Sequence, residues 1–277
     1  MIRVMFNVVQ ASMAYVQPPE LAIAVSRAGG LGSIAGGALR PDELRETIRS
    51  VRAALGELPF AVNLFTPPFS SDAALEVVLE ERPPVFSYTF GALDPAPFRE
   101  RGITVLGTAT TAEEARALDV DAVVAQGAEA GGHRGSFLGH ELVPLAELVP
   151  ACLGDVPVLA AGGITTREDV RAALELGAAG VQVGTAFLYT PECRVAREHR
   201  DALRTYGSIV TDAYTGRAAR MARTPVIDEL LAGPPPLPFG EQRAVSAKVG
   251  PLYLGGLGAP RAREMPAAEL VRELLAA

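Results

Sequence analysis

The sequence predicts an α/β protein whose strands close most simply into a (β/α)8 (TIM) barrel. Eight short runs rich in apolar and β-branched residues alternate with stretches of helical periodicity. The runs are apolar almost throughout, which is typical of parallel strands covered on both faces. The length of 277 residues is that of one such barrel. A doubly wound open sheet remains the alternative, because counting strands does not prove closure.

The eight expected strands are residues 4–9, 31–34, 60–65, 85–88, 104–107, 122–125, 157–161 and 180–183. The helices between them carry start and stop signals. The helix over 19–28 ends at a Gly-Gly pair, and the helix over 41–55 has proline in its first turn with acidic residues behind it. A Thr-x-x-Glu capping box opens the helix over 111–118. The remaining expected helices are 72–81, 95–101, 141–151 and 166–176.

The C-terminal third has a different pattern. A helical region is expected over 194–231, followed by a proline cluster at 234–238 that cannot continue a helix. A glycine-rich segment at 254–258 and an amphipathic helix over 267–275 complete the chain. No linker is long enough to isolate a second domain. We therefore expect one domain over 1–277, with 194–277 as a helical and loop elaboration packed on the barrel mouth.

Composition excludes several classes of function. The net charge is −7 and no basic stripe is visible, which argues against nucleic-acid binding. Two cysteines, Cys152 and Cys193, are too few for a zinc site or a disulfide framework, so no metal is expected. No apolar run approaches the ~20 residues of a membrane span, and no signal peptide is evident at the start. We expect a cytoplasmic protein with no membrane contact.

The stretch Gln126-Gly-Ala-Glu-Ala-Gly-Gly-His-Arg-Gly135 directly follows the sixth strand. Glycine lets a backbone approach a flat ligand closely, and histidine is the side chain whose proton moves near neutral pH. The loop therefore predicts His133 as a catalytic base over a bound cofactor. A flexible loop with a solvated histidine is the alternative interpretation.

A phosphate site is predicted after strands seven and eight. Gly162 and Gly163 follow the seventh strand, and Gly184 and Thr185 follow the eighth, where they can open a short helix. Exposed N–H groups there bind a phosphate without a lysine, and the only lysine is Lys248. The alternative is that these glycines only make tight turns.

Other strand ends give weaker candidates. Asn63 and Gln126 could hydrogen-bond the edge of a heterocycle, although single amides are more often part of loop structure. Met13 could pack on a ring, or simply fill the core. His140 and His199 have no partners at ligand spacing and are expected to be surface or capping residues. Neither a Gly-x-Ser-x-Gly elbow nor a His-Glu-x-x-His pair occurs.

At this point the chain resembles the nitronate monooxygenases, formerly called 2-nitropropane dioxygenases. The resemblance covers residues 8–190 well and the rest loosely. It rests on motifs in the expected order: Gln10-Ala-Ser-Met-Ala14, Ala28-Gly-Gly-Leu-Gly-Ser33, Ala61-Val-Asn-Leu-Phe65, the 126–135 loop, Val158-Leu-Ala-Ala-Gly-Gly-Ile164 and Val181-Gln-Val-Gly-Thr-Ala-Phe187.

The resemblance implies FMN at the barrel mouth, with its phosphate on Gly162, Gly163, Gly184 and Thr185. Asn63 and Gln126 would contact its ring or ribityl chain, and the backbone of Ala11, Ser12 and Met13 would approach the ring. The remaining cofactor-binding candidates are Gly131 and Gly132. Ser12 stands where the family usually has proline, and Tyr15 where a small residue is common. These departures put the natural substrate in doubt more than the cofactor.

The implied activity is oxidation of an alkyl nitronate or nitroalkane with O2, giving a carbonyl compound and nitrite, with His133 as the base. The alternative is an FMN-dependent enoyl-ACP or quinone reductase that uses NAD(P)H, since these enzymes share much of the pattern. A third interpretation, a non-catalytic flavin-binding barrel, is disfavoured by the intact Gly-Gly-His-Arg loop. A small-molecule substrate is the expected partner, and a homodimer is left open.

Overall fold

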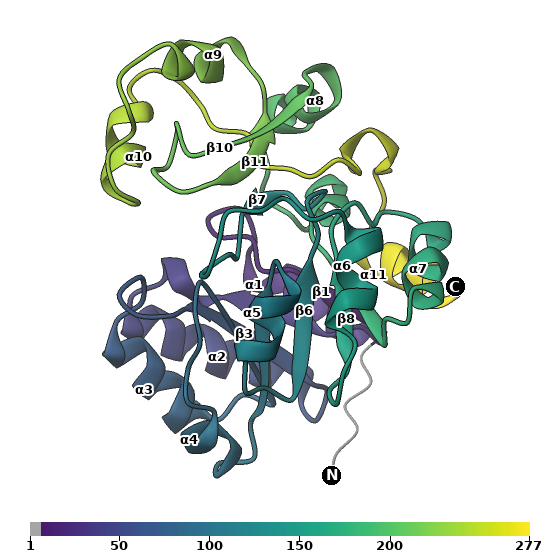
Figure 1. The fold of residues 1–277 in the computed structure, drawn as a ribbon. Coiled ribbons are helices and arrows are strands. Elements are labelled where there is room, and N and C mark those ends of the chain that lie inside the picture. The colour runs from purple at the N-terminus through teal and green to yellow at the C-terminus, as the bar shows by residue number, and fades with distance from the viewer. Residues whose placement is uncertain (1–6) are drawn as a thin grey trace.

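A closed barrel of parallel strands forms the body of the protein (Figure 1). The computed structural model describes residues 7–277. The eight barrel strands are β1 (Val8–Gln10), β2 (Gly32–Ala35), β3 (Phe60–Phe65), β4 (Val85–Thr89), β5 (Thr104–Ala109), β6 (Ala122–Gln126), β8 (Val158–Ala161) and β9 (Gly180–Val183). The first expected strand, 4–9, lies partly outside the described residues.

The barrel closes between its first and second strands. The sheet runs in the order β1-β9-β8-β6-β5-β4-β3-β2. Val9 pairs with Leu31 in a parallel bridge, and Leu31 donates to the Val8 carbonyl at 2.9 Å. This pairing confirms the predicted barrel and rules out the open sheet.

Helices cover the outside of the barrel, where the expected helices lie. They are α1 (Pro19–Arg27), α2 (Pro41–Leu55), α3 (Asp72–Glu81), α4 (Ala96–Arg99), α5 (Ala112–Ala117), α6 (Leu145–Cys152), α7 (Arg167–Glu175) and α11 (Ala267–Leu275). The Thr111 hydroxyl caps α5 by accepting from the Glu114 N–H. The Glu114 carboxylate accepts instead from Thr110 and from the N–H groups of Phe137 and Leu138, so it ties α5 to the loop after β6.

The barrel interior changes from apolar to polar toward the carboxyl ends of its strands. One cluster of buried residues fills the interior: Val9, Leu31, Ala61, Val85, Leu106, Ala122, Val124, Leu159 and Ala161. Side chains on a strand alternate between its faces, so the next inward positions on four strands are Asn63, Ser87, Thr108 and Gln126. The apolar interior of the barrel therefore gives way to hydrogen-bonding side chains at the carboxyl ends of the strands.

The region after the barrel is not wholly helical. It contains α8 (Arg197–Thr205), β10 (Ser208–Thr211), β11 (Ala219–Ala222), α9 (Pro225–Leu231) and α10 (Glu241–Ser246). Strands β10 and β11 form an antiparallel sheet with β7 (Gly132–His133), which belongs to the loop after β6. Figure 1 shows this sheet above the barrel mouth.

The prediction of a helical region over 194–231 is therefore wrong at its centre. The run Ser208-Ile-Val-Thr211 is β-branched, and its partner strand β11 is completed by pairing with β7, more than 80 residues earlier. No helix among residues 7–277 combines the length and apolar character needed to cross a bilayer.

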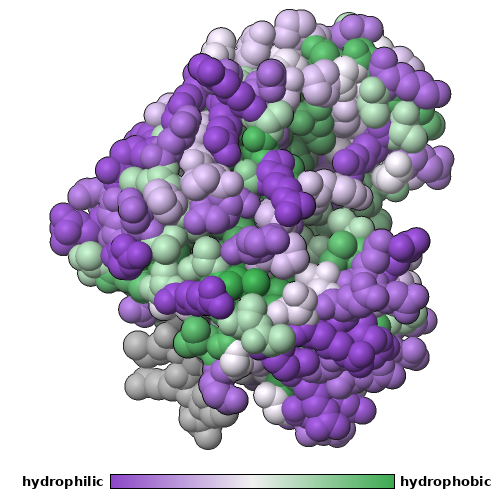
Figure 2. All heavy atoms as spheres, turned by 180° about the vertical axis from the view of Figure 1, so that it is seen from behind, coloured by the Kyte–Doolittle hydropathy of each residue, from purple (hydrophilic) through white to green (hydrophobic). Residues whose placement is uncertain are grey.

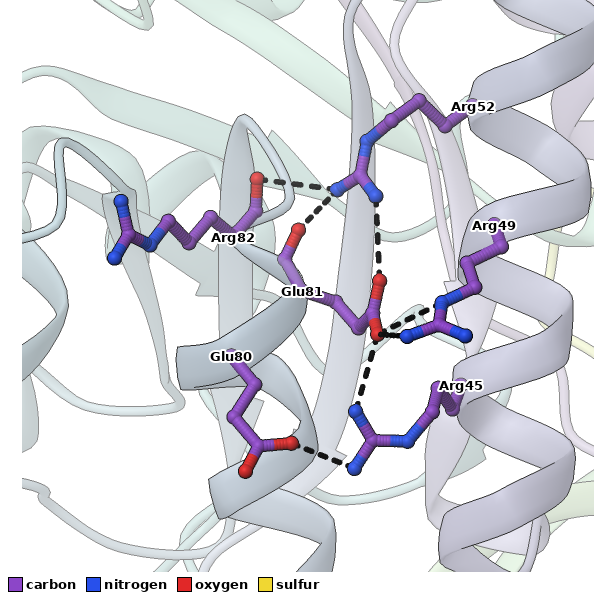
Figure 3. Close-up of polar contacts among 6 residues, drawn as sticks. All are labelled: Arg45, Arg49, Arg52, Glu80, Glu81 and Arg82. Atoms are coloured by element: carbon purple, nitrogen blue, oxygen red, sulfur yellow. Dashed lines mark hydrogen bonds and ion pairs between the residues drawn. The ribbon is translucent and has the colours of Figure 1, made fainter.

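An ionic cluster fastens two helices on the outer wall of the barrel (Figure 3). The Glu81 side chain at the end of α3 is only 8% exposed, and it pairs with Arg45, Arg49 and Arg52 of α2 at 3.1, 2.7 and 3.4 Å. The Arg52 guanidinium also donates to the backbone carbonyls of Glu81 and Arg82. All these interactions lie within the outer layer of helices.

Candidate active site

A cavity of about 560 Å³ opens at the carboxyl ends of the barrel strands, beneath the elaboration. Its volume is in the usual range for small-molecule and cofactor sites. Figure 2 shows the face opposite to that of Figure 1, where hydrophobic residues gather in the notch between the barrel and the elaboration. Every site residue expected from the sequence lines this cavity: Ala11, Ser12, Met13, Asn63, Gln126, Gly131, Gly132, His133, Gly162, Gly163, Gly184 and Thr185.

His133 is fixed by both its backbone and its ring. It lies on β7 and pairs with Ala219 of β11. Its Nε2 lies 3.1 Å from the Thr215 hydroxyl. That hydroxyl donates its own proton to the Arg217 carbonyl at 2.8 Å, so it accepts from His133. The proton of the neutral imidazole is therefore on Nε2, and Nδ1 carries the free lone pair.

The pKa of His133 is lowered to about 4. Burial is the largest cause, and the positive charges of Arg217 and Arg243 add to it. The imidazole is consequently neutral at pH 7 and able to accept a proton. The rings of Phe239 and Phe90 stand edge-on to it, with centroids 5.1 and 6.2 Å away.

Two side chains brace the loop that carries His133. The Gln126 amide donates to the His133 carbonyl at 3.1 Å and accepts from the Gly135 N–H at 2.8 Å. The buried Arg134 guanidinium donates to the carbonyls of Gly127 and Gln126 at 2.6 and 2.8 Å. Gln126, expected from the sequence to contact a ligand, thus also holds the loop, and retains one N–H for a ligand.

Arginines from the elaboration support the same loop from the other side. Arg220 of β11 donates to the Ala128 carbonyl at 2.6 and 3.0 Å. Arg217 donates to the Ser136 carbonyl and lies over the Phe90 ring, 3.8 Å from its centroid. Neither residue was expected from the sequence, because each acts on a segment more than 80 residues away.

The loops after β8 and β9 form a cradle of backbone N–H groups. Gly162 and Gly163 have φ of +124° and +73°, values that side chains rarely adopt. Thr185 begins the short helix Thr185–Tyr189, as expected. Among residues 7–277, the N–H groups of Gly163, Gly184 and Thr185 have no protein acceptor. Unpaired N–H groups at this end of a barrel are suited to an anion such as a phosphate.

The glycine-rich segment 254–258 packs across this cradle. The Gly256 N–H donates to the Thr185 hydroxyl at 2.9 Å. A Cβ on Gly131 would lie 2.3 Å from the Gly256 nitrogen, so the loop of His133 and this segment touch backbone to backbone.

His199 is partly buried and faces the cavity, which corrects the expectation of a surface residue. It lines the cavity, and its Nε2 lies 2.8 Å from the Leu254 carbonyl. Burial lowers its pKa. His140, by contrast, is exposed, as expected.

The remaining candidates are engaged within the protein. Asn63 donates to the Ser87 hydroxyl at 2.9 Å, leaving its own carbonyl for a ligand. The Ser12 hydroxyl is hydrogen-bonded to that of Ser33 at 2.7 Å. No group of three metal-binding side chains gathers among the described residues.

The fold and the cavity together indicate a class of enzyme. A TIM barrel with unpaired N–H groups after its last two strands and a neutral histidine over its mouth has the arrangement of a TIM-barrel enzyme. Comparison with known proteins narrows this class. The family model for nitronate monooxygenase matches residues 1–72 and 69–276. The chain belongs to the nitronate monooxygenase family, which confirms the resemblance found in the sequence.

Relatives and solved structures agree with this assignment. A nitronate monooxygenase from Pseudomonas aeruginosa is 39% identical, over 97% of this chain and 95% of the relative. The structure of a nitroalkane oxidase from Streptomyces ansochromogenes aligns with a TM-score of 0.90 and 33% identity, over 98% of this chain and 96% of that one. FabK from Thermotoga maritima aligns with a TM-score of 0.82 and 29% identity, over 98% and 92%.

Proposed function

We propose that this protein is an FMN-dependent oxidoreductase that oxidises alkyl nitronates or nitroalkanes with O2 to a carbonyl compound and nitrite. The observation that carries the proposal is one cavity that joins a backbone anion cradle to a buried, neutral histidine. Its family and its likeness to a nitroalkane oxidase support the chemistry.

The cavity offers polar groups for the phosphate of FMN and for its ring or ribityl chain. The unpaired N–H groups of Gly163, Gly184 and Thr185 would hold the phosphate. The free carbonyl of Asn63 and the spare N–H of Gln126 would face the ring or the ribityl chain. The other predicted contacts come from Ala11, Ser12, Met13, Gly131, Gly132 and Gly162. When bound, FMN supplies a ring that accepts electrons from the substrate and passes them to O2.

His133 would act as the base for a neutral nitroalkane. Its Nδ1 lone pair takes the α-proton, while Thr215 fixes the tautomer and Gln126 fixes the backbone. The low pKa keeps the base unprotonated at pH 7. Phe90 and Phe239 exclude water from the ring and give an apolar wall for the alkyl group.

We also propose that residues 1–277 act as one domain. The pairing of β7 with β11 makes the loop of His133 a shared part of the barrel and the elaboration. Separating the two would leave Gly132 and His133 without their strand partners.

The weaker likeness to FabK favours the second candidate, an FMN-dependent enoyl-ACP or quinone reductase that uses NAD(P)H. In that case a nicotinamide would dock over the flavin, in the part of the cavity lined by Phe69, Phe90 and Phe239. The two candidates differ in the electron donor, which is directly measurable.

The test compares wild type with His133→Asn, both loaded with FMN. Oxygen uptake and nitrite are measured with nitroethane, which must lose a proton, and with ethyl nitronate, which has already lost it. We expect the variant to lose about 100- to 10,000-fold of the nitroethane rate and to retain most of the nitronate rate. The flavin content of both proteins is the control. Full nitroethane activity in a flavin-replete variant would refute the role of His133.

A further inference from the structure

The charge of the cavity is opposite to that of the protein. The chain carries a net charge of −7, yet no aspartate, glutamate or lysine is present among the described residues that line the cavity. Arg243 of α10 is the one arginine in that lining. A small anion approaching this protein is repelled by most of its surface and attracted at the mouth.

The Arg243 guanidinium is held in place without being neutralised. It lies over the ring of Tyr15, 4.1 Å from the centroid. Tyr15 belongs to the loop between β1 and α1, so the contact joins the barrel to the elaboration. Within residues 7–277, the Arg243 side chain makes no ion pair or hydrogen bond. Its contact is with the face of the Tyr15 ring. Its N–H groups therefore remain available to a ligand.

Tyr15 is unusual in both backbone and exposure. Its φ is +69°, in the left-handed region that non-glycine residues seldom adopt, and it is 72% exposed. A large aromatic residue kept exposed in this backbone conformation is explained if its ring positions Arg243.

The field of Arg243 reaches the reacting end of the cavity. Its charge is one of the causes that lower the pKa of His133. Arg243 and the base therefore act on the same cavity.

We propose that Arg243, positioned by Tyr15, is the specificity-determining residue that selects anionic over neutral substrates at the cavity mouth. The inference rests on the proposed function, because the anion that Arg243 would select there is the nitronate. The binding event itself does not depend on turnover, and this allows a separate test.

The test uses a redox-inert pair of probes, propionate and its neutral analogue propionamide. Each is titrated into FMN-loaded protein, and the visible difference spectrum gives the dissociation constant. We expect Arg243→Gln to weaken propionate binding by about 10-fold and to change propionamide binding by less than about twofold. Arg243→Lys, which keeps the charge, retains the preference, and the difference from wild type shrinks as salt rises.

Two further variants complete the design. Lys248→Gln removes a positive charge from the same elaboration but outside the cavity lining, and is expected to bind both probes as wild type does. Tyr15→Leu leaves the charge and removes its support, so propionate binding falls by a smaller factor than in Arg243→Gln. Unchanged propionate binding in Arg243→Gln overturns the proposal.

Other outcomes separate this inference from the proposed function. A loss of FMN retention in Arg243→Gln would assign Arg243 to the cofactor phosphate and also overturn the proposal. If wild type turns over neither ethyl nitronate nor nitroethane, the proposed function fails, while the propionate preference still decides the role of Arg243. If both are turned over, kcat/KM in Arg243→Gln should fall about 10-fold for the nitronate alone.

Discussion

Two groups of arginines in this molecule are paired in opposite ways. On the outer wall, Arg45, Arg49 and Arg52 converge on the carboxylate of Glu81 (Figure 3). Around the cavity, Arg134 and Arg220 donate to backbone carbonyls of the loop after β6, and Arg217 donates to the Ser136 carbonyl. In the described part of the chain, none of this second group forms an ion pair.

The type of partner decides what each group of arginines contributes. The Glu81 carboxylate offsets part of the charge of the outer arginines, and that cluster holds two helices together. A carbonyl satisfies a guanidinium's N–H groups without cancelling its charge, so the inner arginines fix the loop and leave a positive field over the cavity. Burial, with the added positive charges of Arg217 and Arg243, keeps His133 unprotonated, and positive charge at this site suits an anionic substrate.

Matched Arg→Met substitutions in the two groups should give the largest contrast. Arg134→Met removes a donor from each of the carbonyls of Gln126 and Gly127, the second of which keeps the Ala130 N–H. We expect a loss of about 3 kcal/mol of stability and about 100-fold in kcat, because the base is misplaced. Arg52→Met on the outer wall should cost about 1 kcal/mol or less and leave kcat unchanged. Urea unfolding and nitroethane oxidation measure both effects. Equal losses of kcat in Arg134→Met and Arg52→Met would contradict the distinction between the two groups of arginines.

His133 at the cavity and Glu81 on the outer wall should change the stability of the protein in two different pH ranges. The folded pKa of His133, about 4, lies below its ordinary value of 6.5. The unfolded chain therefore binds this proton first, and stability falls by up to about 3 kcal/mol as the pH drops from 6.5 to 4. Stability is insensitive to this group above that range.

Glu81 acts at lower pH. Hydrogen bonding to Arg49 is the largest cause that lowers its pKa below the ordinary 4.5. Its stabilising contribution is present above that value and is lost as the pH falls through the folded pKa. Unfolding curves of His133→Asn apoprotein should lose most of the upper slope and keep the part that comes from His199, whose pKa is also lowered by burial. Those of Glu81→Gln should lose part of the lower slope. An upper slope as steep in His133→Asn as in wild type contradicts the assignment.

A small effect, confined to stability, is expected from Glu81→Gln at neutral pH. The substitution removes the charge that three arginines share, and we expect a loss of about 1–2 kcal/mol. Activity and FMN affinity should match wild type, since the cluster lies in the outer helical layer. A changed kcat would show that the outer wall is coupled to the site.

Features encoded within one short segment could be predicted from the sequence. The barrel strands follow from apolar runs, and the predicted site residues follow from strand ends, because both are local patterns. Thr166 and Asp169 likewise form the capping box that opens α7. The structure brings all those site residues to one cavity.

What the sequence missed depends on contacts between distant segments. Strand β11 exists because it pairs with the loop of His133, and Thr215, Arg217 and Arg220 act across the same junction. His199 was missed because its partner, the Leu254 carbonyl, carries no side-chain signal. The β-branched run at 208–211 was the one local indication of this sheet.

The central claim is that the barrel mouth binds FMN and that nitronates reduce it. The most direct test is the visible spectrum of protein loaded with FMN, freed of excess cofactor and kept anaerobic, with ethyl nitronate titrated into one cuvette and NAD(P)H into another. We expect flavin to be retained, its absorbance to change with the nitronate and to stay constant with NAD(P)H. Bleaching by NAD(P)H alone would assign the protein to the reductases, and a protein that retains no flavin would contradict the anion cradle itself.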